Sequence, residues 1–214
     1  MDRVKRYYPI FLDLEDKRCL VVGGGPVGLE KTCGLLAAGA NVDVIAEHFT
    51  GSFEELSEDK GKLHLINGSF SEGKVADYYL VIAATGNPDT DYLIYKECHE
   101  AGILVNAADY IPGCDFILPA RFQAGELQIA VSTGGASPAL ATWVRDSIET
   151  FLGHETEILT KMLKEARLVM KERKKMPNKT LWRELLDSGL LEDIKAGNTD
   201  LAKQKIEQFI KKHS

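Results

Sequence analysis

The chain contains the run Arg18-Cys19-Leu20-Val21-Val22-Gly23-Gly24-Gly25-Pro26-Val27-Gly28, from which its architecture can be worked out. Residues 18–22 are short, apolar and partly β-branched, which is typical of a buried strand. The glycines that follow match the pattern G-x-G-x-x-G. Residues 29–38 then place apolar side chains at helical spacing until Gly39 ends the segment. Glycines between a strand and a helix predict a turn that holds a dinucleotide, although the same residues could form only a tight turn.

Each glycine of the pattern has a physical role at such a turn. Gly23 allows the sharp change of direction, Gly25 lets a pyrophosphate approach the backbone, and Gly28 lets the helix pack closely on the strand. The free N–H groups and positive dipole end of the helix attract the pyrophosphate. Glu47 follows the next predicted strand, where a carboxylate binds ribose hydroxyls and repels a 2′-phosphate. NAD is therefore favoured over NADP, with an ordinary exposed glutamate as the alternative.

Strand-like and helix-like segments alternate through the first half of the chain. Apolar runs predict further strands at residues 42–46, 63–67, 79–84 and 103–106, and a helix with a proline in its first turn at 88–101. Strict alternation predicts an α/β fold with a Rossmann-like parallel sheet and helices on both faces. The small residues around Thr85 would leave room for the cofactor at the end of a strand, or serve only packing.

The pattern changes after residue 112. Two strands are expected at 116–121 and 127–132 with a turn at Ala124-Gly125, then a helix at 138–151 and charged helices from 155 onward, interrupted at 176–178 and at Gly189. These segments predict a Rossmann domain at residues 1–112, a small α+β segment at 113–151 and a C-terminal helical domain at 152–214.

Composition excludes several classes of protein. The net charge of -6 argues against a general nucleic-acid binder, and no apolar run approaches the roughly 18 residues of a membrane helix. The N-terminal residues do not resemble a targeting peptide, so we expect a cytoplasmic protein with no membrane partner. The four cysteines lack metal-ligand spacing, and Cys19 and Cys33 fall at apolar positions of the predicted strand and helix, as small buried side chains would. We expect no metal site.

Two further features point to a site. Residues 132–138, Ser-Thr-Gly-Gly-Ala-Ser-Pro, join a strand to a helix and could bind an anion at the helix N-terminus or form a capped turn. Asp109 follows the fifth predicted strand, at the sheet edge where ligands bind in α/β folds. An aspartate there could also be only a turn cap.

Several motifs, in this order, resemble those of the precorrin-2 dehydrogenase family. They are Tyr8-Pro9-Ile10-Phe11-Leu12, Val21-Val22-Gly23-Gly24-Gly25, Val105-Asn106-Ala107-Ala108-Asp109, Phe116-Ile117-Leu118-Pro119-Ala120 and Ser132-Thr133-Gly134-Gly135-Ala136-Ser137-Pro138. Members of this family oxidise precorrin-2 to sirohydrochlorin on the way to sirohaem, and some also insert iron. The resemblance covers residues 8–151.

The resemblance implies roles for individual residues. Asp109 falls at the family's catalytic aspartate, and Thr133 falls where some members carry a serine. Pro26, Val27, Glu47 and His48 fall at cofactor contacts. The predicted cofactor site is therefore Gly23, Gly25, Pro26, Val27, Gly28, Glu47, His48 and Thr85, and the predicted substrate site is Asn106, Arg121, Ser132, Thr133 and Gly134. The resemblance also implies a homodimer, with segment 113–151 supplying much of the contact.

The implied substrate is a reduced tetrapyrrole with multiple carboxylates. Its oxidation transfers a hydride to NAD and releases a proton, which Asp109 could accept as a general base. The basic run between Lys161 and Lys175 is interpreted mainly as a solvated helix face. The sequence leaves ferrochelatase activity open. A dehydrogenase acting on another large anion and a non-catalytic NAD-sensing module that regulates a partner are the alternatives.

Overall fold

The computed structural model describes residues 6–57, 61–108, 110 and 113–213. The chain divides into two compact units, one extending to Leu118 and the other starting at Pro119. The sequence placed boundaries after residues 112 and 151. The hairpin, the next helix and the tail lie together in the second unit, and the division into three domains stays a prediction.

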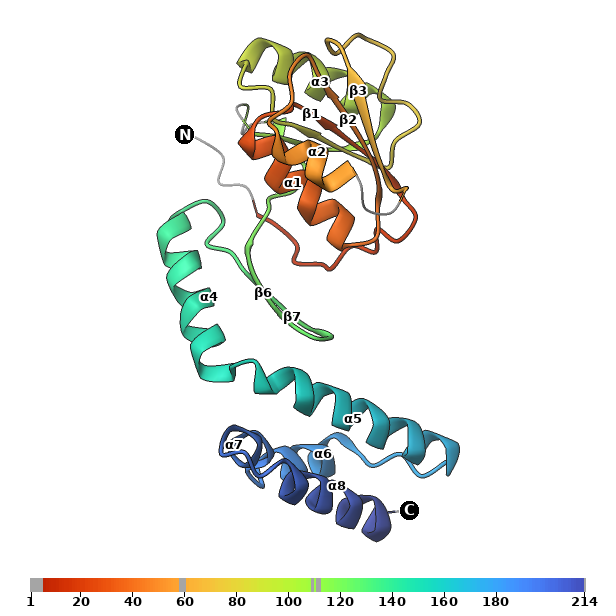
Figure 1. Cartoon of the computed structure of the whole chain (residues 1–214), viewed down its shortest axis with the longest axis vertical. Coiled ribbons are helices and arrows are strands. Elements are labelled where there is room, and N and C mark those ends of the chain that lie inside the picture. The colour runs from red at the N-terminus through yellow and green to blue at the C-terminus, as the bar shows by residue number, and fades with distance from the viewer. Residues whose placement is uncertain (1–5, 58–60, 109, 111–112, 214) are drawn as a thin grey trace. The chain divides into compact units, whose positions relative to one another are not determined.

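The first unit contains the predicted parallel sheet (Figure 1). Its strands are β1 (Arg18–Val22), β2 (Asn41–Ala46), β3 (Leu63–Asn67), β4 (Leu80–Ala83) and β5 (Leu104–Ala107). They lie in the order β3-β2-β1-β4-β5, and each neighbouring pair is parallel. The α/β class and the Rossmann-like topology expected from the sequence are confirmed.

Alternation along the strands builds a core on each face of the sheet. Cys19 and Val21 of β1 face one core, which α1 (Pro26–Ala37) and α2 (Ser52–Ser57) cover with Leu35 and Phe53. Leu20 and Val22 of the same strand face the second core. The helix α3 (Pro88–Ala101) covers this core with Ile94 and Cys98. Successive side chains of a strand point to opposite faces, so the continuous apolar run of β1 serves both cores.

Strict alternation of strand and helix is not observed. Residues 68–79, all described, connect β3 to β4 without a helix. Glu97 of α3 holds this loop, because its Oε1 accepts hydrogen bonds from Gly73 N at 2.8 Å and Val75 N at 3.2 Å. Val75 is buried in the core below α3. A helix is therefore not needed to cover this part of the sheet.

The cysteines have different environments. Burial raises the pKa of the Cys19 thiol to about 11 and that of Cys98 to about 12, so both are protonated at neutral pH. The expectation that Cys33 is buried was wrong, because its side chain is exposed on α1. The buried stripe of this helix runs through Gly28, Thr32 and Leu35 instead. None of the four cysteines, all of which lie in the described part of the chain, forms a disulfide.

The second unit begins with an antiparallel hairpin of β6 (Ala120–Ala124) and β7 (Leu127–Val131). The first of these strands was expected at 116–121. It starts later because Phe116 belongs to the first unit, where its side chain packs on the core and its carbonyl accepts a bond from Asn106 Nδ2 at 2.9 Å. Pro119, the residue before β6, has no backbone N–H and cannot donate a hydrogen bond to the neighbouring strand, so the strand starts after it.

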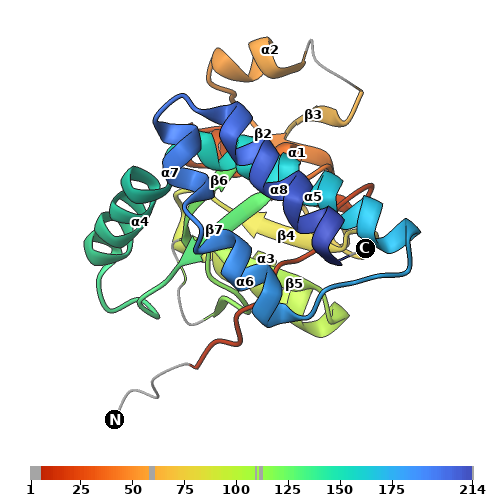
Figure 2. The same cartoon turned by 90° about the horizontal axis from the view of Figure 1, so that it is seen from below.

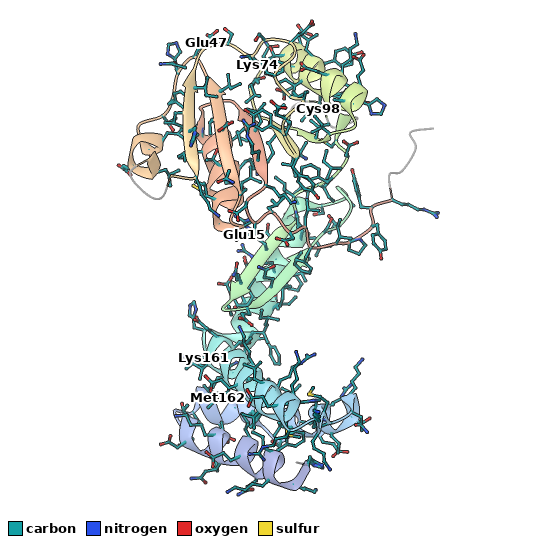
Figure 3. The ribbon with its side chains drawn as sticks, turned by 90° about the vertical axis from the view of Figure 1, so that its right-hand side faces the viewer. Glu15, Glu47, Lys74, Cys98, Lys161 and Met162 are labelled. Atoms are coloured by element: carbon teal, nitrogen blue, oxygen red, sulfur yellow. The ribbon has the colours of Figure 1, made fainter. Side chains whose placement is uncertain are left out.

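Helices make up the rest of the second unit (Figure 2). They are α4 (Pro138–Leu152), α5 (Glu155–Glu172), α6 (Lys179–Leu186), α7 (Leu190–Lys195) and α8 (Thr199–His213). Leu159, Met162, Leu190 and Ile206 form the core of α5 to α8. Figure 3 labels Met162 of this core and the exposed Lys161 beside it. In the described residues, no helix is long and apolar enough to cross a membrane.

Candidate functional site

The sheet has a topological switch point between β1 and β4. From β1 the chain continues to β2 on one side, whereas β4 and β5 lie on the other. In open α/β sheets, ligands bind beyond the carboxyl ends of the strands at such a point, because the connections there diverge and leave a crevice. The candidate site is therefore built from the segments that follow β1, β2, β4 and β5.

The glycines after β1 allow close backbone packing. Gly23 has φ +129°, and a Cβ there would overlap the carbonyl of Ala84 and lie 3.3 Å from the backbone N of Thr85. A Cβ on Gly28 would overlap the carbonyl of Gly23, so only glycine lets α1 approach the turn. A side chain on Gly24 would overlap the carbonyl of His48. This last constraint is outside the G-x-G-x-x-G pattern and was not predicted.

Gly25 differs from these three glycines. Apart from Gly25 itself and its two neighbours in the chain, no heavy atom of the described residues lies within 4 Å of the position that its Cβ would take. Gly25 is the N-cap of α1, no side chain caps the helix in the described structure, and its first turn, beginning Pro26-Val27-Gly28, has no acidic residue. The helix therefore presents free N–H groups and open space at its positive end. These are the requirements for binding the pyrophosphate of a dinucleotide.

Glu47 and His48 lie at the carboxyl end of β2 and are exposed, and Figure 3 labels Glu47 there. Ser69, from the loop after β3, donates a hydrogen bond to Glu47 Oε1. The side chain of Phe49 also borders the glycine turn, because a Cβ on Gly24 would be 3.0 Å from its Cδ1, and the backbone carbonyl of His48 lies closer still. The sequence pattern did not single out Phe49, since an aromatic residue after a strand usually indicates packing.

Thr85 follows β4 and uses its hydroxyl within the protein. The Oγ1 atom donates to Asp91 Oδ1 at 2.6 Å and accepts from Asn87 N at 3.1 Å. Asn87 caps α3 by accepting from the backbone N atoms of Asp89 and Thr90. Thr85 thus lies where the sequence placed it, but its hydroxyl is committed to the turn. A contact with the cofactor would be made by its backbone or methyl group.

The predicted catalytic Asp109 lies outside the described residues. The described residues around it form a well-bonded segment after β5. Ala108 N donates to Ala83 O at 2.8 Å, and the thiol of Cys114 donates to Ala107 O at 3.2 Å. Asp115 exchanges two hydrogen bonds with Val105 on the free edge of the sheet. The assignment of Asp109 stays a prediction.

Tyr110 attaches this segment to α3. Its ring lies 5.3 Å from that of Tyr92 and 5.4 Å from that of Tyr95, measured between centroids. Gly113 is packed against the cluster, since a Cβ there would be 2.5 Å from Tyr110 Cδ1. Asn106 lies within β5, and its amide donates to Phe116 O. That bond gives Asn106 a structural role, and its contact with substrate stays a prediction.

The other predicted substrate residues belong to the second unit. Arg121 is exposed on β6. The turn before α4 is held by side chains: Gly134 N donates to Ser132 Oγ at 3.0 Å, and Thr133 Oγ1 accepts from Ser137 N at 2.9 Å. Ser137 caps the helix by accepting from Leu140 N at 3.2 Å. These bonds support a capped turn, and substrate binding by these residues stays a prediction.

The first unit therefore brings the predicted cofactor residues to one edge of the sheet. They are Gly23, Gly25, Pro26, Val27, Gly28, Glu47, His48 and Thr85. In the described part of the chain, no cluster of three or more histidine, cysteine or acidic side chains could hold a metal ion. These features define a dinucleotide-binding protein of the Rossmann type: a glycine turn at the switch point, a helix without a side-chain cap, and a carboxylate after β2.

Comparison with known proteins makes this class more specific. Residues 10–120 match the family described as "Putative NAD(P)-binding", and residues 125–150 match that described as "Sirohaem biosynthesis protein central". The siroheme synthase of Nitrosococcus oceani is 37% identical over 94% of this chain and 43% of its own length. Siroheme synthase 2 of Yersinia pestis is 37% identical over 95% of this chain and 43% of its own length. The chain spans less than half of each synthase.

A solved structure also matches over nearly the whole chain. SirC, a precorrin-2 dehydrogenase, is 25% identical with a TM-score of 0.74, over 94% of this chain and 100% of that one. The chain belongs to the NAD(P)-binding family, and the resemblance found in its motifs is confirmed.

Proposed function

We propose that this protein oxidises precorrin-2 to sirohydrochlorin with NAD, as a step of sirohaem synthesis in the cytoplasm. The observation that carries the proposal is the glycine turn at the switch point, with open space at Gly25 and a carboxylate at Glu47, in a chain that matches SirC over 94% of its length. Four cysteines without a disulfide among them suit a reducing compartment. The decisive test is NAD-dependent conversion of precorrin-2 by the purified chain.

The reaction removes a hydride and a proton from the tetrapyrrole. Bound NAD supplies the hydride acceptor. The chain must hold the substrate ring against the cofactor, exclude water and accept the proton. Asp109, which comes two residues after the end of β5 in the sequence, is proposed as the general base. Orientation of the two bound rings supplies much of the remaining rate enhancement, so few catalytic side chains are needed.

The substrate carboxylates require cationic or N–H partners. Arg121 is exposed on β6, and the turn at residues 132–137 precedes the N-terminus of α4. We propose that Arg121, Ser132, Thr133 and Gly134, with Asn106 of the first unit, contribute to substrate binding. Iron insertion is not part of the proposal, because no feature of the described residues favours it.

Glu47 is proposed to select NAD over NADP. We expect Glu47→Ala to weaken NAD binding about tenfold, because hydrogen bonds to a charged group are lost, and to reduce the preference over NADP. Titration calorimetry with both dinucleotides measures this. Glu100→Ala removes an exposed carboxylate from α3 of the same unit and serves as the matched control. An unchanged ratio of the two dissociation constants in Glu47→Ala would remove Glu47 from the selectivity mechanism.

We also propose that the chain forms a homodimer through α4. Three large apolar side chains lie on one side of this helix and are exposed in the single chain: Leu140 at 49%, Trp143 at 66% and Phe151 at 70%. They are three and eight residues apart, which are close to one and two helical turns, so they lie along one face of the helix. Exposed apolar clusters of this kind indicate an interaction surface, and a second copy of the chain is the proposed partner.

Trp143→Asp is expected to convert the dimer to monomers at micromolar concentration, because a charge would be buried without a partner. Sedimentation velocity reads the mass directly. Leu168→Asp introduces the same charge at an exposed leucine of α5 and should leave the dimer intact. A Trp143→Asp protein that sediments as a dimer would contradict this interface.

A further inference from the structure

One side of α5 carries a row of basic side chains to which the proposed reaction gives no role. The row consists of Lys161, Lys164, Arg167 and Lys171. These residues are three, three and four positions apart, which places them along one face of the helix. All four are exposed, on the side away from the buried residues of this helix, and Figure 3 labels the first of them. We call them the basic face of α5.

The basic face has few acidic partners. Among the described residues, Lys164 is the only one of the four with a carboxylate at ion-pair distance, that of Glu126. Residues 161–171 contain one acidic residue, Glu165, so this stretch has a net charge of +3. Helix surfaces that only face solvent commonly mix both signs at pairing distance. Positive charge that is not compensated creates a local potential that attracts anions.

Charge is also divided unequally between the two units. Residues 1–118 contain 10 lysines and arginines and 19 acidic residues, a net charge of -9 with histidine neutral. Residues 119–214 contain 16 and 13, a net charge of +3. The stretch 161–171 alone accounts for this +3, so the rest of the second unit is neutral on balance. The attraction that the chain offers to a ligand with several carboxylates is therefore concentrated on α5.

The helix α5 packs against the hairpin that carries Arg121. Lys164 pairs with Glu126, which lies in the turn between β6 and β7. A Cβ on Gly125 of the same turn would be 2.8 Å from Cγ of Glu157, so the turn touches the helix. Figure 1 shows the turn of the hairpin beside α5. The basic face thus adjoins the hairpin whose strand β6 holds a residue proposed to bind the substrate.

We propose that the basic face of α5 attracts the carboxylates of the tetrapyrrole and so increases the rate and the affinity of its capture. The proposal rests on the proposed function, which supplies a substrate whose charge is complementary to this face. Contact with the hairpin of Arg121 places the attraction next to a cation already proposed for the substrate. Long lysine side chains attract an anion without fixing its orientation, so these residues guide the substrate and are not catalytic.

The test reverses two charges of the basic face in the full chain, Lys161→Glu together with Lys171→Glu. At about 0.05 M salt we expect kcat/KM for precorrin-2 to fall about tenfold through a higher KM, because electrostatic attraction speeds association. The kcat value and the dissociation constant of NAD should change by less than about twofold, because attraction of the substrate affects neither. At about 0.5 M salt the difference from the natural chain should shrink to less than about threefold, because salt screens exposed charges. An unchanged KM, or a loss that salt does not reduce, would overturn the proposal.

The double variant Lys203→Glu with Lys211→Glu is the matched control. It makes the same change of charge at exposed positions of α8, in the same unit. Its kcat/KM should stay within about twofold of the natural value, because the potential acts locally. Equal losses in the two double variants would show that only the net charge matters and would contradict a role for α5. The first variant should also keep the natural mass in sedimentation velocity, and a changed mass would assign the basic face to contact between chains instead.

A second measurement needs neither turnover nor a variant. Sirohydrochlorin, the product, keeps the carboxylates of the substrate and serves as the probe. Its dissociation constant for the natural chain should rise at least about fivefold between about 0.05 and about 0.5 M salt. An affinity that is independent of salt would refute attraction by an exposed basic face.

Failure of this proposal and failure of the proposed function have different signs. A chain that binds sirohydrochlorin through the basic face but does not oxidise precorrin-2 supports the role of α5 and contradicts only the reaction. A chain that oxidises precorrin-2 equally well with and without the two reversed charges contradicts only the role of α5.

Discussion

The Gly25→Asp variant is expected to fold normally and to lose NAD binding by at least about 100-fold. The open space at Gly25 accommodates the new side chain without a clash, so the fold is not strained. Aspartate is also a better N-cap than glycine by a few tenths of a kcal/mol. The same carboxylate would occupy the place of the pyrophosphate and repel its charge. Calorimetric titration with NAD measures the loss.

Thermal unfolding of Gly25→Asp separates loss of the site from loss of the fold. We expect the melting temperature to be equal to or slightly above that of the natural chain, because α1 gains a cap. Gly28→Asp is the contrasting variant, since even a Cβ at Gly28 would overlap the Gly23 carbonyl, and it should destabilise the domain. Normal NAD affinity in Gly25→Asp would defeat the assignment of the glycine turn.

Asp109→Ala is expected to lower the turnover of precorrin-2 by about 10²- to 10⁴-fold, the usual contribution of a general base. NAD binding should change by less than about twofold, because the proposed cofactor contacts lie on other segments. Steady-state turnover under anaerobic conditions and an NAD titration of the same preparation measure the two quantities. Asp109→Asn keeps the size of the side chain and should be similarly impaired. If both variants turn over at the natural rate, Asp109 is not the base.

Local signals were sufficient to predict much of the first unit. The strand at residues 63–67 and the helix at 88–101 have the predicted bounds. The helix begins at Pro88 and ends before Gly102, and these residues are typical helix start and stop signals. The glycine turn was recognisable because the pattern of Gly23, Gly25 and Gly28 directly follows a predicted strand and begins a predicted helix. The position of Glu47 followed from the same spacing argument.

Features that depend on tertiary contacts could not be predicted in this way. The bond between Asp91 and Thr85 joins a helix to the turn before it, and the sequence marks Asp91 only as one of several acids near a helix start. The burial of Gly28 and Thr32 rather than Cys33 on α1 depends on how the helix is rotated against the sheet. The late start of β6 follows from the docking of Phe116 on the first core. In each case packing overrode a plausible local pattern.

The most direct test of the proposed function is anaerobic incubation of the purified chain with precorrin-2, with and without NAD, while the absorption spectrum is followed. We predict that sirohydrochlorin forms only when NAD is present, together with one equivalent of NADH. Ferrous iron added afterwards would show whether insertion exceeds the uncatalysed rate. If NAD binds but no sirohydrochlorin forms, the chain is not a precorrin-2 dehydrogenase.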